Sequence, residues 1–173
     1  SHLPFGLNRK KTIEQLYLDP IKKVIEQNGG TVYKDYQQPV IFMIDFKTNS
    51  KETYLKLRDV LKKYERIITV YKKDSIIRMR PIQILISGHV PIAELMTEDS
   101  SFATIDGDVF AMSNSVYDKV ITRYSTAWEK YFSWNGKGDM PFEQKQKLDF
   151  LIEKAHAKRK DIRFYHIPDK PKV

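Results

Sequence analysis

The feature that most constrains the fold is a run of five apolar residues, Val40 to Ile44, that ends in Asp45 and is followed by a helical pattern. A continuous apolar run is typical of a strand buried on both faces, as in a parallel sheet. Ser50 then opens a helix whose apolar residues, Tyr54, Leu57, Leu61 and Tyr64, recur at helical spacing. The sequence therefore predicts a strand–helix unit over this segment.

The same pattern recurs along the chain. Further strands are predicted over 82–86, 102–105, 120–124 and 162–167, and an exposed hairpin over 67–79. Helices are predicted over 12–27 with a restart at Pro20, over 91–96, and from a capping pair, Asp139 and Pro141, through Ala155. Alternating strands and helices of this kind predict one α/β domain over residues 1–173 with a mainly parallel sheet.

Two architectures fit five such strands: a (β/α) barrel or an open α/β sheet, both of which place sites at the carboxyl ends of the strands. The sequence has no Gly-x-Gly-x-x-Gly or Walker-type loop, which disfavours a nucleotide-binding sheet. A complete barrel has eight strands and typically about 250 residues. We therefore expect a partial barrel, about five central strands of a (β/α)8 fold.

The amino-acid composition limits the kinds of partner that the protein can bind. The 30 Lys and Arg against 22 Asp and Glu give a net charge of +8, but the basic residues form short, scattered clusters typical of solvated helix faces. We expect no nucleic-acid partner, since a polyanion-binding role would depend on charge alone, and no transmembrane segment. The chain has no cysteine, which leaves the compartment open, with a secreted or periplasmic location favoured among the alternatives.

An ordered set of short motifs spans nearly the whole chain. They are Thr12 to Pro20 (TIEQLYLDP), Ile44 to Lys47 (IDFK), Ile86 to Gly88 (ISG), Ile105 to Gly107 (IDG), Trp134 to Gly136 (WNG) with Met140 and Pro141, and Arg163 to Tyr165 (RFY) with Pro168 and Asp169. Together they resemble the bacterial and fungal branch of the phosphatidylinositol-phospholipase-C-like phosphodiesterase superfamily, which is related to glycerophosphodiester phosphodiesterases.

The resemblance implies a (β/α)8 barrel that cleaves a phosphodiester with two histidines as acid and base and, in some relatives, a divalent cation held by acidic side chains. The His-Asn-Asp-Tyr-like motif of the family's first strand and the Glu-x-Asp pair of its second strand are absent from this sequence. We therefore expect a chain that lacks the first two strands and the last strand of the barrel, and that is inactive by itself. Its unpaired edges favour self-association.

Asp45 and Lys47 give the strongest site signal. They stand two residues apart at a strand end, so their side chains project to the same side, where a carboxylate can bind a hard cation and an ammonium can meet a phosphate oxygen. An ordinary strand-end salt bridge explains the same spacing. The resemblance implies that Asp45 is a ligand of Mg²⁺ or Ca²⁺ and that Lys47 is catalytic, binding the substrate phosphate.

Other candidates carry weaker signals. The resemblance places His2 at the second catalytic histidine, although a tag remnant or a frayed terminus explains it equally. Ser87 and Asp106 end strands and are candidate substrate contacts, with a Ser-Gly bend and an Asx turn as alternatives. Trp134 and Asp169 are also candidate substrate contacts, with a loop anchor and a Pro-Asp turn as alternatives. The expected substrate is a phosphodiester or phospholipid headgroup; a non-catalytic domain that binds a phosphorylated or anionic ligand is the alternative.

Overall fold

The computed structural model describes residues 10–72 and 75–168. Five strands form the main sheet: β1 (Val40–Phe46), β4 (Ile82–Gly88), β5 (Ala103–Asp108), β6 (Ile121–Ala127) and β7 (Asp161–Tyr165). Four α-helices accompany them: α1 (Asp19–Gln27), α2 (Ser50–Lys62), α3 (Ile92–Thr97) and α4 (Phe142–Ala157). None of the helices in the described part of the chain is long and apolar enough to cross a membrane.

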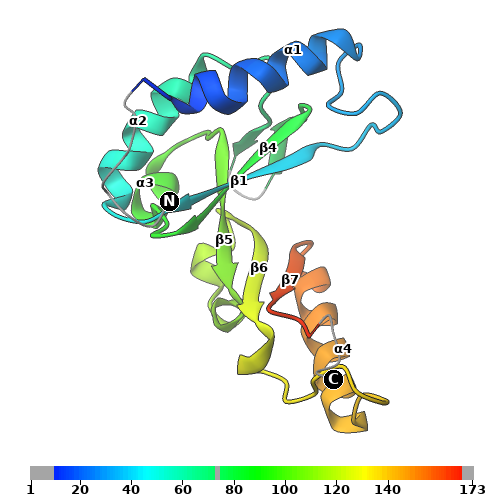
Figure 1. Ribbon diagram of the computed structural model, residues 1–173. Helices are drawn as coiled ribbons and strands as arrows, with labels where there is room; N and C mark the ends of the chain where they lie inside the picture. The colour runs from blue at the N-terminus through cyan, green and yellow to red at the C-terminus, as the bar shows by residue number, and fades with distance from the viewer. Residues whose placement is uncertain (1–9, 73–74, 169–173) are drawn as a thin grey trace.

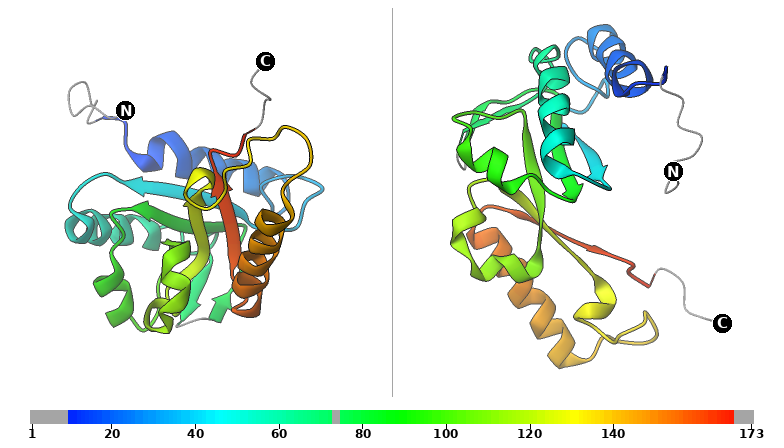
Figure 2. Two further views of the ribbon diagram at one scale, coloured as in Figure 1. Left: turned by 90° about the horizontal axis from the view of Figure 1, so that it is seen from below. Right: turned by 90° about the vertical axis from the view of Figure 1, so that its left-hand side faces the viewer.

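The main sheet is parallel throughout and has the strand order β1-β4-β5-β6-β7. It curls into a half-barrel, and the right-hand view of Figure 2 shows β1 and β7 at its two edges (Figures 1 and 2). All five strands predicted from the sequence are present and run in the same direction, so the parallel α/β architecture is confirmed. The structure agrees with a partial barrel, and the full eight-stranded closure stays a prediction.

The outer face of the curled sheet carries the core. Apolar side chains of β4, including the fully buried Ile84 and Ile86, belong to one buried cluster with Tyr54, Leu57 and Leu61 of α2. Helix α1 lies along the outer side of β1, and α4 covers β7 at the other edge (Figure 1). The inner, concave face carries the polar side chains of the strand ends together with half-buried apolar groups such as Ile41 and Met43.

The first helix differs from the prediction at Pro20. A π-helical turn, Glu14–Leu18, runs directly into α1, so the helix continues through the proline and does not restart there. Proline has no N–H to donate to the preceding turn, but at the first positions of an α-helix that N–H would have no intrahelical partner. The wider π-turn ahead of Pro20 therefore provides a continuous path into α1.

The second and third helices begin where the sequence predicts, within a residue, whereas α4 differs at its start. The prediction that Asp139 caps α4 is wrong, because the capping position is Pro141 and no side chain there bonds to the helix. Instead, Gln144 of the first turn of α4 accepts hydrogen bonds from the main-chain N–H groups of Ser133 (3.0 Å) and Trp134 (2.9 Å). These bonds fix the preceding loop to the helix.

The predicted hairpin is present as the antiparallel pair β2 (Val70–Lys72) and β3 (Ser75–Arg78). Two 3₁₀ segments after β5, Val109–Ser113 and Ser115–Tyr117, were not expected from the sequence. The first is capped by the side chain of Asp108, which accepts a hydrogen bond from the N–H of Phe110 (2.7 Å). These segments continue the rim at the carboxyl end of the sheet.

Candidate functional site

A cleft of about 730 Å³ lies at the carboxyl ends of the five strands. Three of the residues predicted from the sequence, Asp45, Ser87 and Asp106, line it together. The register explains this meeting, because Asp45 is paired with Ser87 across β1 and β4, and Ser87 and Asp106 follow directly after Ile86 and Ile105, the last residues paired between β4 and β5. Residues at matching positions of neighbouring parallel strands point to the same face.

Asp45 and Lys47 form an ion pair at the tip of β1. Both side chains are about half exposed, so the Lys47 ammonium is accessible to a ligand at the edge of the cleft. Gly88 has a φ of +76°, and a Cβ atom there would collide with the carbonyl oxygen of Phe46 and the carboxylate of Asp45. The close approach of β1 and β4 at this point therefore requires glycine.

The Asp106 side chain is enclosed in the cleft, with 6% of its side-chain surface exposed. It accepts a hydrogen bond from the hydroxyl of Ser125 (2.6 Å), and its other oxygen lies 4.0 Å from a guanidinium nitrogen of Arg163. Burial raises the pKa of the Asp106 carboxyl, while Ser125, Arg123 and Arg163 act in the opposite direction. The carboxylate therefore joins β5, β6 and β7 through polar contacts across the concave face.

Sequence reasoning missed Ser125, Arg163 and Tyr165, which also line the cleft. Ser125 is paired with Arg163 across β6 and β7, and the Arg163 guanidinium lies over the ring of Tyr165 at 5.6 Å. The signal that could have found them is the two-residue spacing of polar side chains at each strand end, the same signal that identified Asp45 and Lys47.

Other candidates lie away from the cleft wall or outside the described residues. Trp134 packs edge-on against Trp128 at 6.2 Å, and its indole N–H donates to the carbonyl of Lys137 (3.2 Å), which places it as an anchor of its own loop. His2 and Asp169 lie outside the described residues. The structure thus brings Asp45, Ser87 and Asp106 together in the cleft wall, and Lys47 is paired with Asp45 although it is not itself part of that wall.

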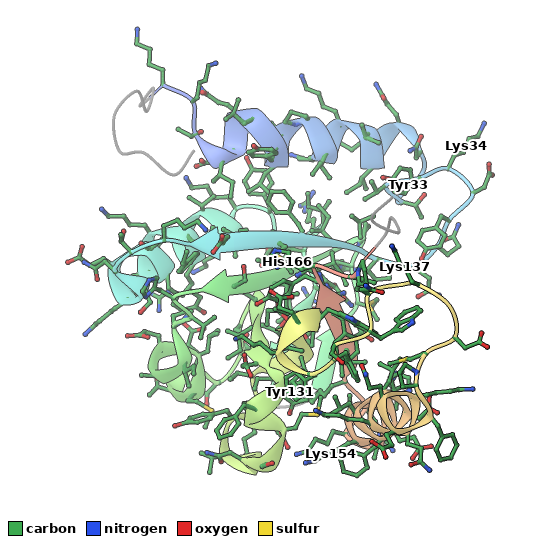
Figure 3. The ribbon with its side chains drawn as sticks, turned by 60° about the horizontal axis from the view of Figure 1, so that its bottom comes forward. Tyr33, Lys34, Tyr131, Lys137, Lys154 and His166 are labelled. Atoms are coloured by element: carbon green, nitrogen blue, oxygen red, sulfur yellow. The ribbon has the colours of Figure 1, made fainter. Side chains whose placement is uncertain are left out.

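His166 follows β7 at the rim, as Figure 3 shows. Its backbone is left-handed, with a φ of +56°, and its Nδ1 lies 3.2 Å from a carboxylate oxygen of Glu129. Both side chains are largely exposed. The pair lies at the same end of the sheet as the cleft, although neither residue is part of the cleft wall.

The donor set of the cleft does not by itself form a cation site. Within the described part of the chain, no group of three His, Cys, Asp or Glu side chains could hold a metal ion. Three carboxylates line the cleft, and each has a partner. Asp45 faces Lys47, Asp106 faces Ser125 and Arg163, and Asp108 accepts a hydrogen bond from the N–H of Phe110. A divalent cation would need ligands in addition to these residues.

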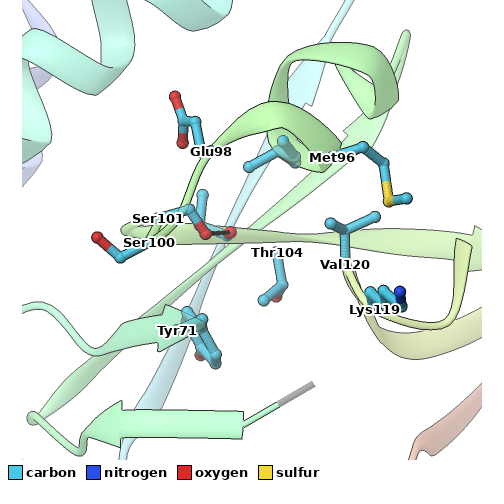
Figure 4. A pocket seen from close by; sticks show the side chains of 10 residues that line it. Tyr71, Met96, Glu98, Ser100, Ser101, Thr104, Lys119 and Val120 are labelled. Carbon is cyan, nitrogen blue, oxygen red and sulfur yellow. Dashed lines mark hydrogen bonds between the residues drawn. The ribbon is translucent and has the colours of Figure 1, made fainter. Parts of the chain in front are cut away.

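A smaller cavity of about 130 Å³ lies at the opposite end of β5 (Figure 4). Its wall includes Tyr71, Ser101 and Thr104. The Ser101 hydroxyl donates to the carbonyl of Ala103 (2.7 Å), and burial raises the pKa of the Tyr71 hydroxyl. Glu98 and Lys119 are the charged residues of its wall, and the cavity is much smaller than the cleft, so it is a weaker candidate for the site.

The chain also matches a known protein family. A family model described as the AIM6-like phosphodiesterase domain matches residues 1–106, which is more than half of the 173-residue chain. The chain belongs to this family. The AIM6-like match covers β1 to β5 up to Asp106 and includes Asp45, Lys47 and Ser87. Searches of curated proteins and of solved structures found no match.

Membership in the AIM6-like phosphodiesterase family agrees with the phosphodiesterase class predicted from the sequence. The finer assignment, to the phosphatidylinositol-phospholipase-C-like and glycerophosphodiesterase branch, stays a prediction. Ser125, Arg163 and Tyr165 lie beyond the matched residues, so the cleft is completed by a part of the chain that the family model does not cover.

Proposed function

We propose that the cleft binds a phosphodiester of the glycerophosphodiester or phospholipid-headgroup type and that the complete site hydrolyses it. The observation that carries the proposal is the convergence of Asp45, Asp106 and Arg163 on one cleft, with Lys47 at its edge, in a chain of the AIM6-like phosphodiesterase family. Cations at the carboxyl ends of parallel strands are well placed to stabilise charge on phosphoryl oxygens.

Arg163 is the proposed main contact of the phosphate. A guanidinium presents several N–H donors in a planar fork that matches phosphate oxygens, and stacking on Tyr165 limits its rotation. Asp106 lies 4.0 Å from Arg163 and is itself fixed by the hydrogen bond from Ser125. Lys47 would supply a second, more mobile positive charge at the edge of the cleft.

The proposed cation is Mg²⁺ or Ca²⁺, with Asp45 as one of its ligands and two histidines, one of them His2, as acid and base. When bound, such a cation would neutralise charge on the phosphoryl oxygens. Because the described residues do not complete a cation site, we expect this chain alone to bind the cation weakly and to turn over no phosphodiester. Turnover by the chain would contradict that expectation.

Binding of glycerophosphocholine, measured by titration calorimetry, tests the cleft directly. We expect Arg163→Gln to weaken binding about tenfold or more and Lys47→Gln to weaken it less, because a charge-assisted, bidentate contact is stronger than a mobile point charge. Lys23→Gln is the control, since Lys23 is an exposed cation on α1, away from the cleft. Equal affinities for Arg163→Gln and Lys23→Gln would overturn the proposed site.

A second candidate function is non-catalytic binding of a phosphorylated or anionic ligand in the same cleft. It is favoured by the observation that, within the described residues, two of the three carboxylates of the cleft, Asp45 and Asp106, face cations and no three-ligand metal group exists. Calorimetric titration with Mg²⁺ and Ca²⁺ separates the two functions. Cation binding, even if weak, that is lost in Asp45→Asn supports the metal-assisted hydrolase, whereas absence of cation binding even at high cation concentration supports the binding domain.

A further inference from the structure

A second cavity, of about 370 Å³, lies at the end of the sheet opposite the cleft. It opens where β1 and β4 begin, beside Pro39 and Pro81, whereas the cleft lies where these strands end. Two arginines, Arg66 and Arg80, line it. Its described wall contains no acidic side chain, so the charge of the two guanidinium groups is not balanced locally.

Arg80 is held in place by its main chain. Its N–H donates to the hydroxyl of the fully buried Thr69 (3.0 Å), and that hydroxyl donates to the carbonyl of Arg80 (3.1 Å). The next residue, Pro81, accepts a hydrogen bond from the N–H of Val40 (2.8 Å). The side chain of Arg80 therefore starts from a rigid segment between the hairpin and β4.

The guanidinium of Arg80 has an unmet hydrogen-bonding group. Its Nε is buried and has no hydrogen-bond partner among the residues that the structure describes. A buried donor on a charged group that lacks a partner carries a substantial desolvation cost. Within the same described part of the chain, neither Arg80 nor Arg66 forms an ion pair, and Arg66 is exposed at the cavity.

The opposite wall is formed by the loop between α1 and β1, which Figure 3 marks at Tyr33 and Lys34. The loop is tied down at its start, because the N–H of Gly30 donates to the carbonyl of Ile25 (2.8 Å) and the Asn28 amide donates to the carbonyl of Val32 (2.8 Å). It contributes Gln37 and Gln38, whose amide groups are neutral donors, to the cavity.

We propose that this cavity is a binding site for a phosphate group, separate from the cleft. Two guanidinium groups and two side-chain amides supply only positive charge and neutral polar groups, and a tetrahedral oxyanion offers the several acceptor oxygens that such donors require. An anion bound in the cavity would balance the charge of both arginines. The phosphate can come from free inorganic phosphate or from a small phosphomonoester, which present the same oxygens.

Titration calorimetry with inorganic phosphate and, in a parallel arm, with glycerol 3-phosphate tests the site. We expect Arg80→Gln and Arg66→Gln each to weaken phosphate binding about tenfold or more, the range typical of losing one charge-assisted contact. Arg66→Gln keeps the test valid if Arg80→Gln fails to fold, because Arg66 is exposed. Lys145→Gln, an exposed cation on α4, is the matched control and should bind as the wild type does.

Arg163→Gln separates this site from the cleft. If the cavity binds phosphate, Arg163→Gln retains a phosphate-binding event that Arg163→Gln combined with Arg66→Gln loses. A rise in Tm with phosphate should follow the same pattern. Tighter binding of inorganic phosphate than of glycerol 3-phosphate would identify a free-ion site, and the reverse order a phosphomonoester site. Unchanged phosphate affinity in Arg66→Gln and Arg80→Gln would overturn the proposal, whatever the cleft binds.

Discussion

Gly88 shows how a single residue controls the candidate site. Its left-handed backbone, with a φ of +76°, turns the chain at the end of β4, and its missing side chain leaves room for the Asp45 carboxylate and the Phe46 carbonyl. Gly29 has nearly the same φ, +73°, but nothing lies within 4 Å of the position its Cβ would take. Substitutions at the two glycines therefore separate the cost of a left-handed backbone from the cost of a steric collision.

We predict that Gly88→Ala destabilises the protein more than Gly29→Ala does. Gly29→Ala should cost about 1 kcal/mol from the left-handed backbone alone. Gly88→Ala should cost about 3 kcal/mol or more, because β1 must also move away from the new methyl group. Chemical denaturation of both variants measures the difference, and equal costs would show that the space beside Asp45 is not limiting.

Asp106 gives a prediction about pH. Burial raises the pKa of its carboxyl in the folded protein above the unfolded value, so the folded state binds the proton more tightly. The stability gained from this proton is fully present below the unfolded pKa, near 3.9, and is lost as the pH rises through the folded pKa.

Asp106→Asn removes this titration while keeping an oxygen that accepts from Ser125. We therefore expect the free energy of unfolding of the wild type, relative to Asp106→Asn, to increase as the pH falls from 7 toward 4. Urea denaturation at several pH values measures the difference. A constant difference across this range would contradict the raised pKa.

At the scale of elements, α2 illustrates what the sequence determines. Tyr54, Leu57 and Leu61 were predicted on one face from their spacing, and all three are buried. Leu61 is fully buried, whereas its neighbour Lys62 is exposed.

Leu61→Ala should therefore destabilise the protein by about 2–5 kcal/mol, as large-to-small substitutions in a core do. Lys62→Ala is the matched control on the next residue of the same helix and should change stability by less than about 0.5 kcal/mol. Thermal and chemical denaturation of both variants provide the measurement. Similar effects for the two substitutions would mean that α2 does not pack on the sheet through this face.

Spacing predicted the strands because apolar runs that are buried on both faces leave a strong pattern in the sequence, as Val40 to Ile44 does. It failed at Asp139, because a capping side chain needs a particular loop geometry that residue type alone does not set. The candidate site was therefore predicted only in part. Asp45 and Ser87 follow their own strands, but the role of Arg163 depends on how β7 is placed beside β6.

At the scale of the whole molecule, the main sheet has two edges. Within the described residues, β1 and β7 each pair with one neighbour, so each has a free row of main-chain donors and acceptors. The inner face between them carries half-buried apolar groups such as Ile41 and Met43. Such edges favour pairing with another chain.

We predict that the chain self-associates through these edges in a concentration-dependent way. Sedimentation velocity over a wide concentration range should show a shift from monomer to larger species. Ile41→Lys, which places a charge on the inner face at the end away from Asp45, should reduce the association. A monomer at every concentration would contradict the prediction.

The contact between Asp106 and Arg163 also has a consequence for synthesis. The two residues are 57 positions apart, and Arg163 belongs to the last strand of the sheet. A nascent chain that has emerged only as far as β6 already carries Asp106, Ser125 and Arg123 but lacks Arg163. The contact between Asp106 and Arg163 can therefore form only after β7 has been synthesised, so ribosome-bound intermediates that end before β7 lack the link from β5 to β7.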